Sequence, residues 1–198
     1  YFGGKEKLEA KLDELFTASS ETAGRHQADI TGLIGQYAHG NEPSHHMAYL
    51  YNYVNKPWKS QERVSQILKE MYSNAPDGLS GNEDCGQMSS WYVLSAMGIY
   101  PVTPGLDYYT IGSPRLEKAS INLENGNQFQ IIAKGASEEF KYIQSASLNG
   151  KAFNRSYIYH SEIMDGGTLE FVMTNTPNEN WAAADAEIPV STIEDAVI

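Results

Sequence analysis

The sequence has 198 residues, of which 41% are hydrophobic and 20% are charged, and its formal net charge is −11. This length allows one large or two small domains with a sizeable core, and the acidic charge argues against nucleic acid and anionic membranes as partners. No apolar run approaches the roughly 18 residues of a membrane-spanning helix. The chain opens at Tyr1 with neither an initiator methionine nor a signal peptide, so we expect a piece of a longer protein.

The first part of the chain has the apolar spacing of helices. Apolar residues three and four positions apart predict a helix over residues 5–16. A second, weaker helix is predicted over 26–37, where Gly32 and Gly35 count against it. Pro43 stands at the expected first position of the next helix.

Two further helices are predicted before the middle of the chain. Ser60 is the expected N-cap of one of them, whose apolar face includes Val64 and Leu68. The other covers 88–97 and should end at Gly98, because glycine favours the C-terminal end of a helix. The short connections between successive helices predict antiparallel helical hairpins.

The pattern changes to β-forming residues after a proline- and glycine-containing segment at 100–105. Candidate strands lie at 108–111, 119–123, 128–133, 142–148, 157–160 and 168–173. Asn-Gly pairs at 125–126 and 149–150 are typical of hairpin turns. Because no helix-length segment separates these runs, we expect an antiparallel sheet or part of a sandwich rather than a parallel sheet. The predicted fold class is therefore α+β, with a helical domain over 1–103 and an antiparallel β region over 104–198.

The densest group of polar residues lies at the predicted start of the helix over 88–97. It consists of Asn82, Glu83, Asp84 and Gln87. Adjacent carboxylates at a helix start point about 100° apart, so one can face a cleft while the other caps the helix. A cleft carboxylate can deprotonate a water or hold a hard cation such as calcium. The alternative is an acidic first turn that complements the helix dipole.

A second polar loop opens a helix earlier in the chain, at residues 39–46. Asn41 and Glu42 occupy the corresponding place in this loop. Carboxylate and amide oxygens from two loops are the ligands that calcium takes. The alternative is helix capping, because Asn before Pro is a common helix entry.

Three of the five histidines, His39, His45 and His46, fall within this second loop. The adjacent pair does not match the one-turn spacing of the two histidines on a catalytic zinc helix. Recognition of sugar hydroxyls or hydrogen bonding in the core is therefore favoured over metal ligation. The aromatic residues around both loops can stack on sugars or pack between helices.

The single cysteine, Cys85, lies inside the acidic cluster and cannot form a disulfide within the chain. A nucleophilic cysteine needs a base and an electropositive setting. Glu83 and Asp84 would favour the neutral thiol instead. A catalytic thiol is therefore disfavoured.

Several motifs together resemble those of glycoside hydrolase family 92, the bacterial, calcium-dependent, inverting α-mannosidases. They are Gly40-Asn41-Glu42-Pro43-Ser44-His45-His46, Pro76-Asp77-Gly78-Leu79-Ser80-Gly81-Asn82-Glu83-Asp84-Cys85-Gly86-Gln87-Met88-Ser89-Ser90-Trp91 and Gly98-Ile99-Tyr100-Pro101-Val102. Shorter matches lie at Leu148-Asn149-Gly150-Lys151 and at Gly166-Gly167-Thr168-Leu169-Glu170-Phe171. The resemblance extends from about Leu8 to Trp181.

The resemblance implies a larger enzyme with an N-terminal β-sandwich, an (α/α)6 barrel and an active site between them. This chain would supply the last barrel helices over 1–103 and the C-terminal β region over 104–198. The general acid, a Glu on an earlier barrel segment, would lie before Tyr1. The chain alone would then be inactive, and the missing N-terminal part would be its partner.

The resemblance also implies roles for particular residues. Asp84 matches the general base; Glu83 could share that role, because some family members carry a second Asp where this chain has Asn82. Asn41 and Glu42 match the loop near the calcium ion. The implied substrate-binding residues are His45, His46, Asn82 and Gln87.

The implied activity is exo-acting hydrolysis of α-mannosidic linkages in mannose-rich glycans. The implied cofactor is Ca2+, and the implied location is secreted, periplasmic or on the cell surface of a bacterium. Two alternatives stay open. One is a non-catalytic carbohydrate-binding or structural module, and the other is an (α/α)6 glycosidase that acts on a different sugar.

Overall fold

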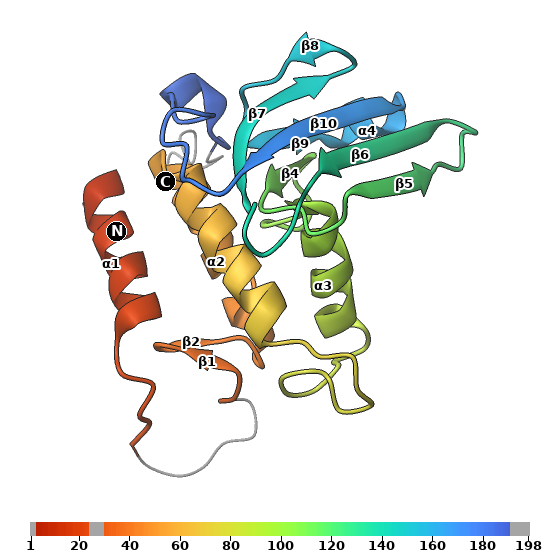
Figure 1. Cartoon of the computed structure of the whole chain (residues 1–198). Coiled ribbons are helices and arrows are strands. Elements are labelled where there is room, and N and C mark those ends of the chain that lie inside the picture. Colours follow the sequence, from red (N-terminus) through yellow and green to blue (C-terminus); the bar gives the residue numbers. More distant parts are fainter. Residues whose placement is uncertain (1–2, 24–29, 191–198) are drawn as a thin grey trace, which may run out of the picture.

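The computed structural model describes residues 3–23 and 30–190. Helices α1, α2 and α3 gather in one part of the molecule, and most strands lie in another part beside them (Figure 1). The observed fold class is α+β, as predicted. Whether the helices belong to an (α/α)6 barrel stays a prediction.

The three long helices are α1 (Lys5–Thr17), α2 (Pro57–Glu70) and α3 (Gln87–Met97). The predicted helix over 5–16 is confirmed, and α3 ends at Gly98 as expected. Ser60 is not the N-cap of α2, because the helix already begins at Pro57. Proline is pre-organised for the first helical turn, so it starts the helix earlier. The buried Ser60 hydroxyl instead accepts a hydrogen bond of 2.9 Å from Asn52 Nδ2.

The described part of the predicted helix over 26–37 is a β-hairpin. Strands β1 (Leu33–Ile34) and β2 (Tyr37–Ala38) pair antiparallel. Residues 26–29 of that prediction lie outside the described residues. Gly32 and Gly35 adopt positive φ angles of 63° and 61°, which an α-helix does not contain. A side chain at Gly35 would also collide with the backbone carbonyl of Leu15 in α1.

The segment that follows Pro43 is helical, but it forms two 3₁₀-helices. These are η1 (Glu42–Ser44) and η2 (Met47–Val54). Pro43 stands in the first turn of η1, where its missing N–H is not needed. Asn55 ends η2 in the left-handed conformation, with φ 62°.

The strands of the second part occur close to their predicted positions. They are β3 (Ile99–Tyr100), β4 (Tyr108–Ile111), β5 (Lys118–Asn122), β6 (Gln128–Lys134), β7 (Tyr142–Leu148), β8 (Lys151–Ala152), β9 (Tyr157–Tyr159) and β10 (Gly167–Thr174). A short helix, α4 (His160–Met164), and a 3₁₀ turn, η3 (Asp185–Glu187), complete the described elements. All six predicted strands are therefore confirmed.

The prediction of a wholly antiparallel β region is wrong, because the larger sheet is mixed. Its strand order is β5-β6-β10-β7-β8, and β10 runs parallel to β6 but antiparallel to β7. A strand inserted between two strands of opposite direction must be parallel to one of them. The smaller sheet, in the order β3-β4-β9, is antiparallel.

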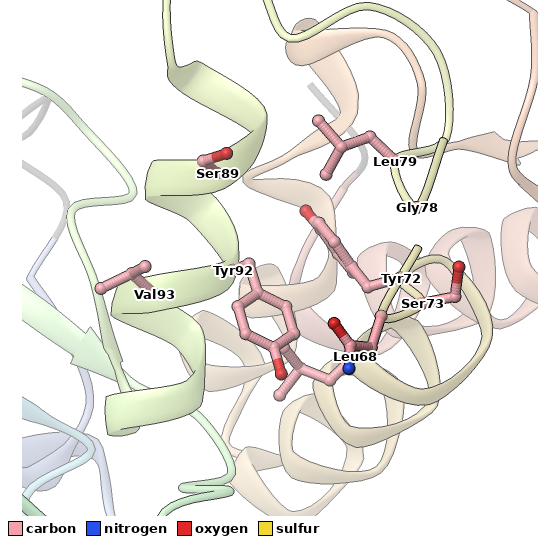
Figure 2. A pocket seen from close by; sticks show the side chains of 9 residues that line it. Leu68, Tyr72, Ser73, Gly78, Leu79, Ser89, Tyr92 and Val93 are labelled. Atoms are coloured by element: carbon pink, nitrogen blue, oxygen red, sulfur yellow. The ribbon is translucent and has the colours of Figure 1, made fainter. Parts of the chain in front are cut away.

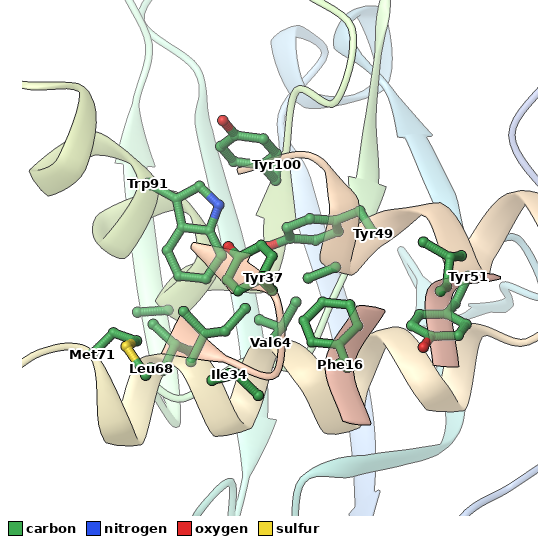
Figure 3. Close-up of a cluster of buried hydrophobic side chains, with 14 of the residues drawn as sticks. Phe16, Ile34, Tyr37, Tyr49, Tyr51, Val64, Leu68, Met71, Trp91 and Tyr100 are labelled. Atoms are coloured by element: carbon green, nitrogen blue, oxygen red, sulfur yellow. The ribbon is translucent and has the colours of Figure 1, made fainter. Parts of the chain in front are cut away.

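Two apolar clusters hold the molecule together. The helical cluster lies between α1, η2, α2 and α3 and is rich in buried aromatic rings, including Tyr37, Tyr49, Tyr51 and Trp91 (Figure 3). The sheet cluster is mostly aliphatic. The neighbouring residues Ile99 and Tyr100 belong to different clusters, so the core changes at β3. The predicted domain boundary at 103/104 stays a prediction.

A buried hydrogen bond also joins the two parts. Gln61, on α2, accepts a bond of 2.9 Å at Oε1 from the backbone N–H of Ile143 in β7. Among the described residues, none of the helices has the length and apolar character that crossing a membrane requires.

Candidate active site

The two polar loops of the sequence meet at a pair of glycines. A Cβ atom on Gly81 would lie 2.9 Å from the carbonyl oxygen and 3.0 Å from the Cα of Gly40. A Cβ atom on Gly40 would collide with Thr31 and would lie 2.9 Å from the carbonyl oxygen of Ser80. Real Cβ atoms do not come so close to backbone, so this contact needs glycine on both sides.

Beyond this glycine contact, the side chains of Glu42 and Asp84 interact with each other. Their hydrogen bond is the main reason why the pKa of the Glu42 carboxyl lies below its usual value. Glu42 is half-buried and Asp84 is exposed. Two carboxyl groups that share a hydrogen bond hold one proton between them, because two ionised carboxylates have no hydrogen to share and repel each other. The structure thus brings together one acidic residue from each predicted loop.

The backbone at Asp84 is unusual. Asp84, Cys85 and Gly86 have successive positive φ angles of 50°, 57° and 95°. Each non-glycine residue in this conformation costs about 1–2 kcal/mol. Strained backbone of this kind occurs preferentially at functional sites, which makes this loop a candidate site.

Glu83 points to the helix rather than to Glu42. Its Oε1 accepts a hydrogen bond of 3.0 Å from the Ser89 backbone N–H, and its Oε2 accepts one of 2.7 Å from the Ser89 hydroxyl. These two bonds lower the pKa of the Glu83 carboxyl. The adjacent carboxylates therefore diverge, with Glu83 capping α3 and Asp84 reaching the other loop.

His45 is buried between the two loops. Its Nε2 lies 2.9 Å from the carbonyl oxygen of His39, so Nε2 carries the proton and donates it. Its Nδ1 then accepts a hydrogen bond of 3.2 Å from the Gln87 amide. Burial is the main cause that lowers the pKa of His45, which keeps the ring neutral. Gln87 also donates to the Tyr100 hydroxyl at 3.2 Å.

His39 belongs to a buried chain of hydrogen bonds that sequence reasoning did not place. The Tyr72 hydroxyl donates to the carbonyl oxygen of Met88 at 3.1 Å, so it accepts from His39 Nε2 at 2.6 Å. His39 Nδ1 then accepts from the Tyr37 hydroxyl at 2.8 Å. Burial, aided by the nearby His45, lowers the pKa of His39 to about 3. The arrangement matches the core-hydrogen-bonding interpretation of this histidine.

The remaining predicted residues are at least partly exposed. Asn82 is exposed, and Asn41 is half-buried at the N-cap position of η1 without a side-chain capping bond to that helix. His46 is half-buried, and its burial is the main cause that lowers its pKa. It lines a pocket of about 740 Å³ together with Leu50 and Tyr53.

A second pocket, of about 440 Å³, lies between α3 and the end of α2. Figure 2 shows Tyr92 and Val93 on α3 and Leu68 and Tyr72 on the other side. Neither of these two pockets is lined by Glu42 or Asp84. Glu42 and Asp84 therefore lie outside both pockets.

The donor set fits a calcium ion only in part. Glu42, Asp84 and Asn41 offer the oxygen atoms that calcium prefers. However, no group of three or more His, Cys, Asp or Glu side chains in 3–23 and 30–190 is arranged to hold a metal. These residues can therefore supply some ligands of such a site but do not complete one.

Comparison with known proteins gives consistent matches along most of the chain. The model of the glycosyl hydrolase family 92 catalytic domain matches residues 1–175. An uncharacterized secreted glycosidase of the fungus Arthroderma benhamiae is 31% identical over 96% of this chain and 23% of its own length.

Solved structures agree with this match. A family GH92 α-mannosidase from Bacteroides thetaiotaomicron, in complex with mannoimidazole, has a TM-score of 0.91 and 44% identity; the match covers 96% of this chain and 25% of that one. A family GH92 inverting mannosidase from the same species has a TM-score of 0.83 and 38% identity, over 96% of this chain and 27% of that one. This chain thus spans about a quarter of the length of these relatives. Since the family model covers more than half of its residues, the chain belongs to glycosyl hydrolase family 92.

Proposed function

We propose that this chain is the part of an exo-acting, inverting α-mannosidase that carries the general base. The observation that supports this best is the meeting of Glu42 and Asp84 across two loops held by Gly40 and Gly81. The mannosidase names of the matched structures support the choice of sugar. The substrate would be a mannose-containing oligosaccharide or glycan.

In this proposal Asp84 takes a proton from the attacking water. An inverting hydrolase needs a second carboxyl group about 6.5–9.5 Å away, which protonates the leaving oxygen. Glu42 is too close to Asp84 for that role, because their side chains share a hydrogen bond. Glu83 is committed to capping α3. The acid would therefore come from another part of the enzyme, in the remaining helices of an (α/α)6 barrel.

The isolated chain is proposed to be inactive for this reason. A missing general acid typically costs about 10²–10⁴-fold in rate. Further walls of the sugar site would also be missing, because the acidic pair lies outside the two pockets of this chain. Its partner would be the N-terminal part of the same enzyme.

A calcium ion is proposed as cofactor of the whole enzyme, with Asn41 and Glu42 among its ligands. When bound, it would hold sugar hydroxyl oxygens and favour a distorted ring. Asn82, His46 and Gln87 are proposed to position the substrate around the acidic pair. His45 is the other proposed substrate-binding residue, although both of its ring nitrogens already have protein partners.

The whole enzyme is proposed to act outside the cytoplasm of a bacterium. The name of the fungal relative, a secreted glycosidase, supports a location outside the cytoplasm. The matched mannosidases of Bacteroides thetaiotaomicron support a bacterial source. Degradation of mannose-rich glycans in the periplasm or at the cell surface would fit this placement.

The test compares aryl α-mannoside and aryl α-glucoside as substrates of the whole enzyme that contains this chain, with and without a calcium chelator. We expect turnover of the mannoside alone and its loss on chelation. Turnover of the glucoside instead would indicate a different glycosidase. Binding of mannosides without any turnover would indicate a non-catalytic module. Robust turnover by the isolated 198-residue chain would contradict the proposed need for a separate acid.

A further inference from the structure

The side chains of Glu42 and Asp84 are close together although the two residues lie on separate loops. Their carboxyl groups lie close enough to share a hydrogen bond, but they repel each other once both are ionised, as Asp84 must be to act as a base. Asp84 also sits in a backbone conformation that costs free energy. Something other than the pair itself must therefore hold the two loops together.

The glycine contact holds the loops only on one side of the pair. Gly40 precedes Glu42 by two residues, and Gly81 precedes Asp84 by three. These glycines fix how the backbones enter the two loops. They do not restrain the segments that leave the acidic residues.

A hydrogen bond joins the loops on the other side. His45 follows Glu42 by three residues, and Gln87 follows Asp84 by three. The amide of Gln87 donates to His45 Nδ1 at 3.2 Å. The acidic pair is therefore enclosed between a backbone contact before it and this side-chain bond after it.

Both partners of this bond are themselves held in place. His45 donates from Nε2 to the carbonyl oxygen of His39, and its own carbonyl oxygen accepts a bond of 3.0 Å from Trp91 Nε1. The ring of His45 also lies against that of His39, with centroids 4.7 Å apart. Because Nε2 carries the proton, Nδ1 can only accept, and Gln87 supplies the donor it needs.

Gln87 is fixed by a second bond, to the Tyr100 hydroxyl at 3.2 Å. Tyr100 stacks on buried Tyr49, with ring centroids 5.1 Å apart (Figure 3). Gln87 is also the first residue of α3, directly after the strained loop. Its side chain therefore connects the end of that loop to the rigid aromatic core.

We propose that Gln87 is a positioning residue that sets the spacing of Glu42 and Asp84 through its hydrogen bonds to His45 and Tyr100. The role of Gln87 in catalysis rests on the proposed function, in which the Asp84 carboxylate must face the attacking water. The structural part of the proposal concerns this chain alone. It can therefore be tested without any measurement of activity.

Cys85 makes a direct test practical, because it is exposed and is the single cysteine of the chain. A nitroxide attached there broadens the NMR signals of nearby amides according to their distance. In the unchanged full chain, the Glu42 and His46 amides should be broadened strongly. The amide of Phe129, in the sheet, serves as a distant reference.

The decisive variant is Gln87→Met, which keeps the length of the side chain but removes its hydrogen-bond donors. We expect the broadening at Glu42 and His46 to fall by at least about twofold, since the loops then separate locally. The 15N signal of His45 Nδ1 should also move, because it loses its donor. The matched control is Ser90→Met, which places the same side chain at an exposed position in the same turn of α3.

Unchanged broadening in Gln87→Met would overturn the proposal, as would an equal fall in Ser90→Met. If Gln87→Met does not fold, Tyr100→Phe decides instead, because it removes only one of the two acceptors. A smaller fall in broadening with this variant would support the positioning role. Unchanged broadening there would overturn it.

Discussion

The helical region and the strand region each contain a buried apolar cluster, but they differ in the polar side chains that they bury. The helical region buries two histidines, His39 and His45, in ordered hydrogen bonds. In the described strand region, His160 is exposed. Single non-glycine residues with positive φ angles occur in both regions, as at Asn149, but among the described residues two consecutive ones occur only at Asp84 and Cys85 in the helical region. The difference indicates that the strand region mainly supports the fold, whereas the loops of the helical region hold the candidate site.

Removing one large aromatic side chain from each region should separate these roles most strongly. Trp91→Ala and Phe129→Ala should each destabilise the protein by about 3–5 kcal/mol, because both side chains are fully buried. Trp91 also donates a hydrogen bond to the His45 carbonyl. Only its loss should therefore loosen the acidic loops.

Urea unfolding measures the stability of both variants, and hydrogen exchange locates the change. Trp91→Ala should speed exchange in residues 39–46, whereas Phe129→Ala should speed exchange in the strands around β6. Equal acceleration of residues 39–46 in both variants would show that the two regions do not have separate roles.

Mild acid should weaken the helical region first. The pKa of His39 is about 3 in the folded protein, against about 6.5 in an unfolded chain. The unfolded state therefore binds more protons below pH 6.5, so stability is present above that pH and is lost as the pH falls toward 3. At about pH 4.5 the expected loss from this group is about 2–3 kcal/mol.

Hydrogen exchange at pH 7 and at about pH 4.5, corrected for intrinsic rates, checks this sign. Amides around His39 and Tyr72 should lose protection before those of β6 and β10. His160→Gln serves as the control and should leave this order unchanged, because His160 is exposed. Loss of protection in the strands first would contradict the assignment of the acid-sensitive group.

The smallest expected difference between two variants concerns two glycines. Gly81 and Gly126 both have positive φ angles, of 93° and 86°, so an alanine costs about 1–2 kcal/mol at either position. A Cβ at Gly126 meets open space, whereas one at Gly81 meets the backbone of Gly40. We expect Gly81→Ala to lose a further 1–3 kcal/mol, roughly the cost of overpacking. Thermal or urea unfolding measures both losses of stability. Equal losses for the two variants would mean that the loops accommodate the added methyl group at Gly81 at little cost in free energy.

The strand region was the easier part to predict from the sequence. Its strands are short runs between clear turn signals, and the pair Asn149-Gly150 has the two positive φ angles of a tight hairpin turn. The parallel pairing of β10 with β6 was missed. Local pattern does not show that a late strand inserts between two earlier ones.

The candidate site was predictable only in its composition. The two loops could be selected from their residues, and the divergence of Glu83 and Asp84 was expected. Its cause differs from the expected helix geometry, because both residues precede α3 and Asp84 has a left-handed backbone. Their contact could not be read from the sequence, because it depends on two glycines far apart in the chain. The hairpin around Gly35 was mistaken for a helix for a similar reason, since its close approach to Leu15 is a tertiary contact.

The most direct test of the central claim compares Asp84→Asn with Glu83→Gln in the whole enzyme. If Asp84 is the base, Asp84→Asn should lower turnover of an aryl α-mannoside by about 10²–10⁴-fold while the fold is kept. Glu83→Gln should have a much smaller effect, since Glu83 caps α3. Azide should restore part of the lost rate in Asp84→Asn and give a β-configured product. Near-normal turnover in Asp84→Asn, with turnover abolished in Glu83→Gln, would contradict the account.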